Sequence, residues 1–166
     1  MNESDNIVAD TAARIFSDLA DPRTVNSARN ADWKPPLWRA LCDAGLPLAW
    51  VPDNLGGAGA GLADGFAVLA VAGRYAVSVP LAETLLAGWL LAEAGLNAPD
   101  DSMTVAPVRP RDAITLNADG TLSGRASGVP FASDAKHIAV LATSGDGLTI
   151  ALVDTADCRI DDGVNI

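Results

Sequence analysis

Cysteine and histidine are scarce in this chain. Two cysteines, Cys42 and Cys158, and one histidine, His137, occur among 166 residues. A disulfide framework needs several cysteines at close spacings, and a structural zinc site needs about four Cys or His ligands. We therefore expect neither a disulfide scaffold nor a metal site.

Basic charge and long apolar runs are also lacking. Eleven basic residues face 21 acidic ones, which gives a formal net charge of -10. Such a surface repels nucleic-acid phosphates and anionic lipids, so we expect no nucleic-acid partner. The longest apolar stretch, residues 81–91, contains Glu83, and we expect no membrane span. The N-terminus is acidic where a secretory signal is basic, which favours a cytoplasmic protein.

Hydrophobic residues make up 49% of the chain, enough for a packed core, and the first half has helical periodicity. Apolar residues at helical spacing predict a helix over 8–19, with Ser4 or Asp5 as its cap and an end near Asp21-Pro22. Residues 23–35 look like a polar connector. A second helix begins at Pro35-Pro36 and ends at a left-handed Gly45.

The segment after Gly45 combines an uncharged stretch with a glycine loop. Residues 46–51 carry no charge, so we expect a buried connector, followed by a Pro52-Asp53 turn. The loop 56–61 lacks the Lys-Ser or Lys-Thr of a phosphate-binding loop, and a structural turn is expected.

Two further helices are predicted. In the third, Leu62, Phe66, Leu69 and Gly73 share one face, and we expect another helix to pack closely there. The fourth, over 81–94, is opened by Pro80 and has almost no polar face, so other helices or a partner must surround it.

The second half changes to short, β-branched or alternating segments. Strands are predicted over 103–108, 113–116, 122–129, 138–142 and 148–153, with hairpin turns at 117–120 and 144–147. The sequence therefore predicts an α+β protein. An N-terminal helical domain (1–98) is followed by part of an antiparallel β domain (99–166).

Three segments, in this order, resemble the acyl-CoA dehydrogenase family. They are AGLPLAWVPDNLGGAGAGLAD, GRYAVSVPLAETLLAGWLLAEAG and LSGRASGVPFASDAKHIAVLA. The resemblance covers the chain from about Ile7 onward. It implies an N-terminal helical domain and an incomplete β-barrel-like middle domain, with the family's C-terminal helical domain absent.

The resemblance also implies an activity. Members of this family oxidise an acyl-CoA thioester to the 2,3-enoyl-CoA: a carboxylate removes the α proton while FAD accepts a hydride. The family's catalytic glutamate belongs to the part that we expect to be missing. Glu3, Glu83 and Glu93 are better explained as a terminal residue and two helix-end residues, so no catalytic residue is assigned.

Candidate FAD contacts lie in the third segment. Where the family often has an aromatic residue and a Thr or Ser, this chain has Gly128 and Pro130. Val129, Phe131 and Ser133 are the cofactor-binding candidates if the turn is shifted. Alternatively, Phe131 is a core residue and Ser133 a turn residue.

Other polar candidates have simpler explanations. Arg109 and Arg111 occupy the region of the family's flavin loop, where they either meet a phosphate or serve solubility. We expect His137 to be structural and Cys42 to pack in the core.

Two functional hypotheses follow from the resemblance. The chain is part of a flavin-dependent acyl-CoA dehydrogenase that needs the missing half or a partner subunit, or it is a non-catalytic subunit of a heteromeric assembly. The expected partners are an acyl-CoA substrate and acyl-CoA dehydrogenase-like subunits, of the same or another chain. A free-standing binding module explains the composition but not the ordered segments.

Overall fold

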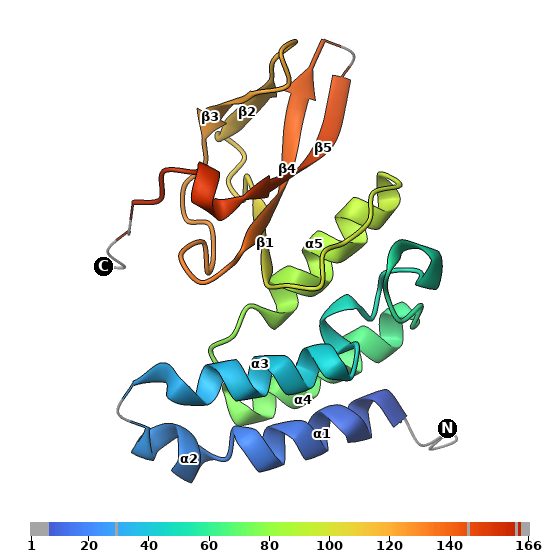
Figure 1. Cartoon of the computed structure of the whole chain (residues 1–166), viewed down its shortest axis with the longest axis vertical. Coiled ribbons are helices and arrows are strands. Elements are labelled where there is room, and N and C mark those ends of the chain that lie inside the picture. Colours follow the sequence, from blue (N-terminus) through green and yellow to red (C-terminus); the bar gives the residue numbers. More distant parts are fainter. Residues whose placement is uncertain (1–6, 29, 146, 162, 164–166) are drawn as a thin grey trace.

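The computed structural model describes residues 7–28, 30–145, 147–161 and 163, in which a helical half is followed by a sheet (Figure 1). The helices are α1 (Ile7–Leu19), α2 (Pro22–Ser27), α3 (Lys34–Asp43), α4 (Leu62–Tyr75) and α5 (Leu81–Glu93). The strands are β1 (Met103–Ala106), β2 (Ala113–Leu116), β3 (Leu122–Arg125), β4 (His137–Ser144) and β5 (Gly147–Asp154). Short 3-10 turns lie at Ala31–Trp33, Leu46–Leu48, Asp53–Leu55 and Thr155–Asp157.

Helices α1, α3 and α4 lie side by side and enclose the first core (Figure 1). Phe16 of α1 stacks on Tyr75 of α4 with 5.8 Å between the ring centroids. The largest fully buried side chains of this core are Phe16, Leu37, Leu41, Val68 and Leu85. The predicted helices over 8–19 and from Pro35-Pro36 are confirmed, whereas the caps Ser4 and Asp5 lie outside the described residues.

The prediction of a plain polar connector over 23–35 is wrong. Helix α2 and a 3-10 turn occupy most of it. The Asp21 side chain accepts a hydrogen bond from the Arg23 N–H at 2.8 Å, and Pro22 occupies the first turn. An N-cap aspartate followed by proline is a helix-start signal that outweighs the polar composition.

The buried connector is confirmed. Gly45 is left-handed, with φ of 68°, and Leu46, Leu48 and Val51 are buried. A Cβ on Gly57 would overlap the backbone of Val51, so the glycine loop folds back directly onto the connector. The loop therefore has a structural role, as expected.

The predicted packing face of the third helix is wrong. Leu62 and Phe66 of α4 are 59% and 58% exposed, while Gly65, Val68 and Val71 face the core. A Cβ on Gly65 would overlap the Trp50 indole, whose Nε1 donates to the Leu62 carbonyl at 3.2 Å. Because only glycine leaves room for this ring, Trp50 sets the rotation of α4.

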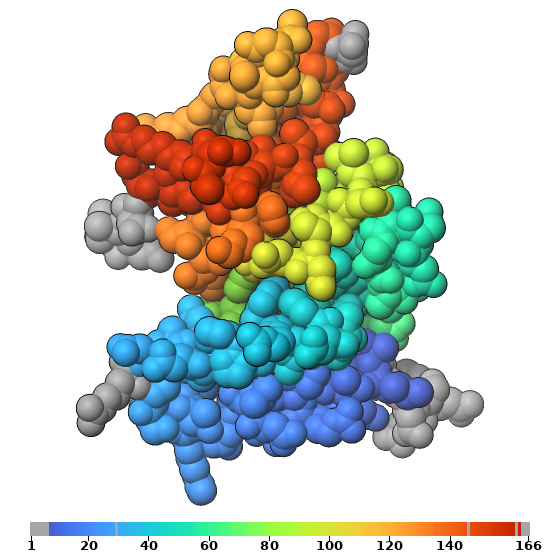
Figure 2. All heavy atoms as spheres, viewed as in Figure 1, coloured from blue at the N-terminus to red at the C-terminus, as the bar shows by residue number. Residues whose placement is uncertain are grey.

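Helix α5 joins the two halves. It buries one side, and Gly88 lets it approach the connector, since a Cβ there would lie 2.8 Å from a Val51 methyl group. Leu86 and Trp89 remain partly exposed. The other described elements therefore cover only part of this apolar helix. Figure 2 shows the strands in orange and red above the helices in blue and cyan.

The sheet is organised around β4. Strands β1 and β2 pair with β4 in parallel, β5 pairs with it antiparallel, and β2–β3 is an antiparallel hairpin. The α+β fold class and both predicted hairpins are confirmed. The sheet is mixed rather than purely antiparallel, and the described strands do not close a barrel. Turn residues in the sequence predict antiparallel hairpins. The long connection over 126–136, which leads to the parallel strand β4, has no comparable signal in the sequence.

A buried threonine fixes the contact between α5 and β1. Thr84 Oγ1 accepts from the Met103 N–H at 3.0 Å and lies 2.6 Å from the Pro80 carbonyl, to which it donates. Around it, Leu48, Val51 and Leu91 form a second core with Met103 and other residues of the sheet. The predicted domain boundary at 98/99 falls between α5 and β1 and stays a prediction.

No helix within the described ranges is both long enough and apolar enough to cross a membrane.

We predict that Thr84→Val lowers the free energy of unfolding of the 166-residue chain by about 1–3 kcal/mol, because it leaves the buried Met103 N–H without an acceptor. Thr115→Val is the control, because Thr115 is exposed on β2; its change stays within about 0.5 kcal/mol. Urea unfolding measures both. Equal effects of the two variants would contradict the assigned role of Thr84.

We also predict that Gly65→Ala destabilises the chain by about 1–3 kcal/mol, since the new methyl group overlaps Trp50. Gly73→Ala, in the same helix, has no atom within 4 Å of the added Cβ and is neutral or stabilising by up to about 1 kcal/mol. Thermal unfolding distinguishes the two variants. A Gly65→Ala protein as stable as Gly73→Ala would show that Trp50 does not set the position of α4.

Candidate functional site

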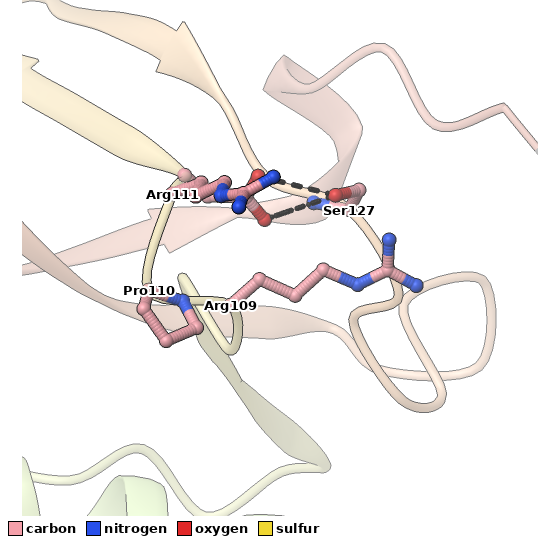
Figure 3. Close-up of a pocket in the computed structure, with 5 residues that line it drawn as sticks. Arg109, Pro110, Arg111 and Ser127 are labelled. Carbon is pink, nitrogen blue, oxygen red and sulfur yellow. Dashed lines mark hydrogen bonds between the residues drawn. The ribbon is translucent and has the colours of Figure 1, made fainter.

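A groove lies beside the loop between β1 and β2. Its volume is about 460 Å³, and it is lined by Arg109, Pro110, Arg111, Asp112 and Ser127 (Figure 3). The Asp112 N–H donates to the Arg109 carbonyl at 3.0 Å, which closes a tight turn. The groove is therefore built from one turn and from the segment that leaves β3.

Asp112 joins these two segments through hydrogen bonds. Its carboxylate accepts from the Ser127 N–H at 2.7 Å and from the Ser127 hydroxyl at 3.0 Å, the bonds drawn dashed in Figure 3. Hydrogen bonds to a charged acceptor are stronger than neutral ones, so this contact holds the two segments together.

Arg109 lies against Gly128. A Cβ on Gly128 would stand 3.0 Å from Nη2 and 3.2 Å from Nε of Arg109, and the φ of Gly128 is +69°. Both the space and the backbone conformation thus favour glycine here. The guanidinium takes the place that a side chain at position 128 would fill.

The predicted cofactor residues lie on the next turn, and they differ in exposure. Val129 is partly buried and packs against the core on one face of the sheet. Phe131 is partly buried, with a left-handed φ of 52°, and Ser133 is exposed. Contacts of these three residues with a flavin stay a prediction.

The turn itself is already bonded to the protein. The Pro130 carbonyl accepts from Thr104 Oγ1 at 2.7 Å, and the Phe131 carbonyl accepts from the N–H groups of Asp134 and Ala135. Lys34 of α3 pairs with Asp134 at 3.4 Å. The turn is therefore anchored to both halves of the chain.

By themselves, these residues do not fit a flavin ring. Pro130 has no N–H to donate, Arg109 lies over Gly128, and Val129 points into the core. We therefore derive no reaction step through FAD from this chain.

The described acids, cysteines and histidine give no catalytic arrangement. Glu83 and Glu93 lie at the two ends of α5, and neither lines the groove. Partial burial, together with nearby Asp100 and Asp101, raises the pKa of Cys42 to about 11, so this thiol is a poor nucleophile at neutral pH. His137 is half-buried and makes no side-chain hydrogen bond with the described residues. Within the described ranges, no group of three His, Cys, Asp or Glu side chains could hold a metal ion.

Comparison with known proteins identifies the family of this chain. Residues 2–98 match the family described as "Acyl-CoA dehydrogenase, N-terminal domain". This chain belongs to the acyl-CoA dehydrogenase family, whose members use FAD.

Two curated relatives come from mycobacteria. Acyl-CoA dehydrogenase IpdE2 of Mycobacterium tuberculosis is 32% identical over 146 residues, which cover 86% of this chain and 43% of that protein. Acyl-CoA dehydrogenase IpdE2 of Mycolicibacterium smegmatis is 29% identical over 141 residues, 83% of this chain and 45% of that protein. This chain thus spans less than half the length of the relatives that it matches.

Solved structures agree with the fold. The Tcur3481-Tcur3483 steroid ACAD G363A variant is 32% identical with a TM-score of 0.72, over 91% of this chain and 47% of that chain. The ChsE4-ChsE5 complex from Mycobacterium tuberculosis has a TM-score of 0.73 at 24% identity, over 95% of this chain and 48% of that chain, and shows the fold alone.

We predict that Cys42 alkylates slowly at neutral pH. In a Cys158→Ser variant, the iodoacetamide rate rises about tenfold per pH unit above pH 7 and levels only near pH 11, because the thiolate is the nucleophile. Mass spectrometry at each pH measures the rate. A plateau near pH 8.5 would contradict the acidic, partly buried setting of Cys42.

Proposed function

We propose that this chain is one component of a flavin-dependent acyl-CoA dehydrogenase and that further protein must cover its sheet before the enzyme is active. The open sheet is the observation that carries the proposal. Leu141, Leu148 and Leu152 are 40%, 74% and 39% exposed on it.

These leucines share one face. Pairing places Leu141 opposite Ile150, Leu148 opposite Thr143, and Leu152 opposite Ala139, and directly opposed residues point to the same side of a sheet. Helix α5 covers this face only where Ala139 and Ile150 join the second core. Leu141, Leu148 and Leu152 lie beyond this cover and stay exposed, and an apolar surface of this kind marks a site of association.

The outer edge of β5 adds a second open feature. Among the described strands, β5 pairs only with β4, which leaves the backbone groups of its other edge available. Proteins normally cover or interrupt such edges. An additional strand or subunit would cover the edge and the leucines together.

The comparisons favour another subunit as the cover. One similar structure is described as a complex of ChsE4 with ChsE5, and another pairs Tcur3481 with Tcur3483 and is described as a steroid ACAD. We propose a similar two-component assembly here, acting on an acyl-CoA whose acyl group derives from a steroid.

In the proposed reaction, an acyl-CoA becomes the 2,3-enoyl-CoA, and bound FAD supplies the hydride acceptor. No described carboxylate of this chain is placed as the base, so the base comes from the additional protein. The part of this chain is to supply one wall of the assembly, through α4, α5 and the sheet. A cytoplasmic location and the absence of a nucleic-acid partner remain predictions.

A second candidate function is a structural subunit that binds no flavin. Arg109 lying over Gly128, together with Pro130, favours it, because these residues replace a stacking ring and a hydrogen-bond donor. In that case the partner subunit holds FAD entirely.

The leucine face is tested by a charge substitution. We predict that the wild-type chain self-associates at tens of micromolar, because its sheet is bare, and that Leu148→Glu weakens association about tenfold or more. Ile7→Glu is the control, since Ile7 is 75% exposed on α1, in the other half of the molecule. Sedimentation velocity over a concentration series measures both. A monomeric wild-type chain, or an equal effect of Ile7→Glu, would show that the leucine face does not drive association.

A further inference from the structure

We propose that the groove formed by Arg109–Asp112 and Ser127 binds a phosphate or pyrophosphate group. This inference concerns a binding site for an anion. It holds whether or not the chain takes part in acyl-CoA oxidation.

The first support is that the guanidinium groups of Arg109 and Arg111 are not engaged in ion pairs. Arg109 and Arg111 are exposed and make no ion pair with any described residue. Their N–H donors therefore remain available for an anion.

Asp112, the acid in the groove, makes no ion pair with Arg109 or Arg111. The Asp112 carboxylate is engaged by the N–H and the hydroxyl of Ser127. It carries one negative charge against two positive ones, so the groove keeps a net positive charge. Pairing places Arg125 opposite Ala113, which brings a third cation to the same end of the β2–β3 hairpin.

The second support is that the groove is pre-formed. Contact with Gly128 restricts Arg109, and Pro110 with the Arg109–Asp112 turn bond stiffens the backbone between the two arginines. Figure 3 shows the Arg109 side chain extended along the groove beneath Ser127. Ordering a free arginine costs up to about 2 kcal/mol, and a restricted one loses less on binding.

The chemistry of the donors identifies the ligand class. Guanidinium groups match the oxygens of a phosphate in a two-pronged geometry. A groove of about 460 Å³ admits a pyrophosphate, and two cations favour a multiply charged anion over a single carboxylate. The net charge of -10 acts against extended polyanions, so a small phosphate-bearing molecule is expected.

The test is a titration of the ¹⁵N-labelled 166-residue chain with inorganic pyrophosphate, followed by the Nε–Hε signals of the arginines. We expect saturable shifts of Arg109 and Arg111 that weaken as salt rises. Arg109→Gln and Arg111→Gln each lower the affinity about tenfold, and Arg74→Gln, on the exposed surface of α4, leaves it unchanged.

A fourth variant, Gly128→Ala, keeps both arginines but places a methyl group 3.0 Å from Arg109 Nη2, and we expect it to lower the affinity as well. Unfolding curves for every variant check that the fold is kept. Shifts that do not saturate, or a loss in Arg74→Gln equal to that in Arg109→Gln, would overturn the proposal.

Three nucleotides identify the source of the phosphate. Tighter binding of CoA than of dephospho-CoA supports recognition of the ribose phosphate, whereas equal binding of CoA, dephospho-CoA and ADP supports recognition of the pyrophosphate. Failure of all three, with no saturable response to pyrophosphate, would contradict the site.

Discussion

The structure depends on the buried contact between α5 and β1. Thr84 supplies an acceptor to the Met103 N–H, and Leu48, Val51 and Leu91 pack with Met103 in the same core. This core includes residues from the connector, the last helix and two strands. The open leucine face and the cationic groove both belong to the sheet that α5 holds against the helices.

Local chemistry in the sequence predicts much of this fold. The positive φ of Gly45, the uncharged connector and both hairpins follow from residues that act on their own neighbourhood. Contacts between distant residues are not visible in the same way. The rotation of α4 depends on the Trp50 ring meeting Gly65, and the parallel pairing of β1 with β4 spans more than 30 residues of chain. Periodicity alone therefore predicts the wrong side of α4 for Leu62 and Phe66.

The sequence predicts some residues of the candidate site but not the contacts between them. Family resemblance points to Val129, Phe131 and Ser133, and it leaves the two arginines as either phosphate contacts or solubilising residues. The structure shows how Arg109 and Gly128 complement each other and how Asp112 binds Ser127. These pairs join two loops separated by a hairpin, so no short motif reveals them. A member of a flavin-using family thus presents, in this half, a cationic groove and an uncovered sheet rather than a complete flavin pocket.

We propose that this chain needs further protein to act as a flavin enzyme. The most direct measurement is the visible absorbance of the purified 166-residue chain after incubation with FAD and gel filtration, together with enoyl-CoA formation. We expect a colourless chain without turnover. One equivalent of bound FAD with turnover by the chain alone would contradict it.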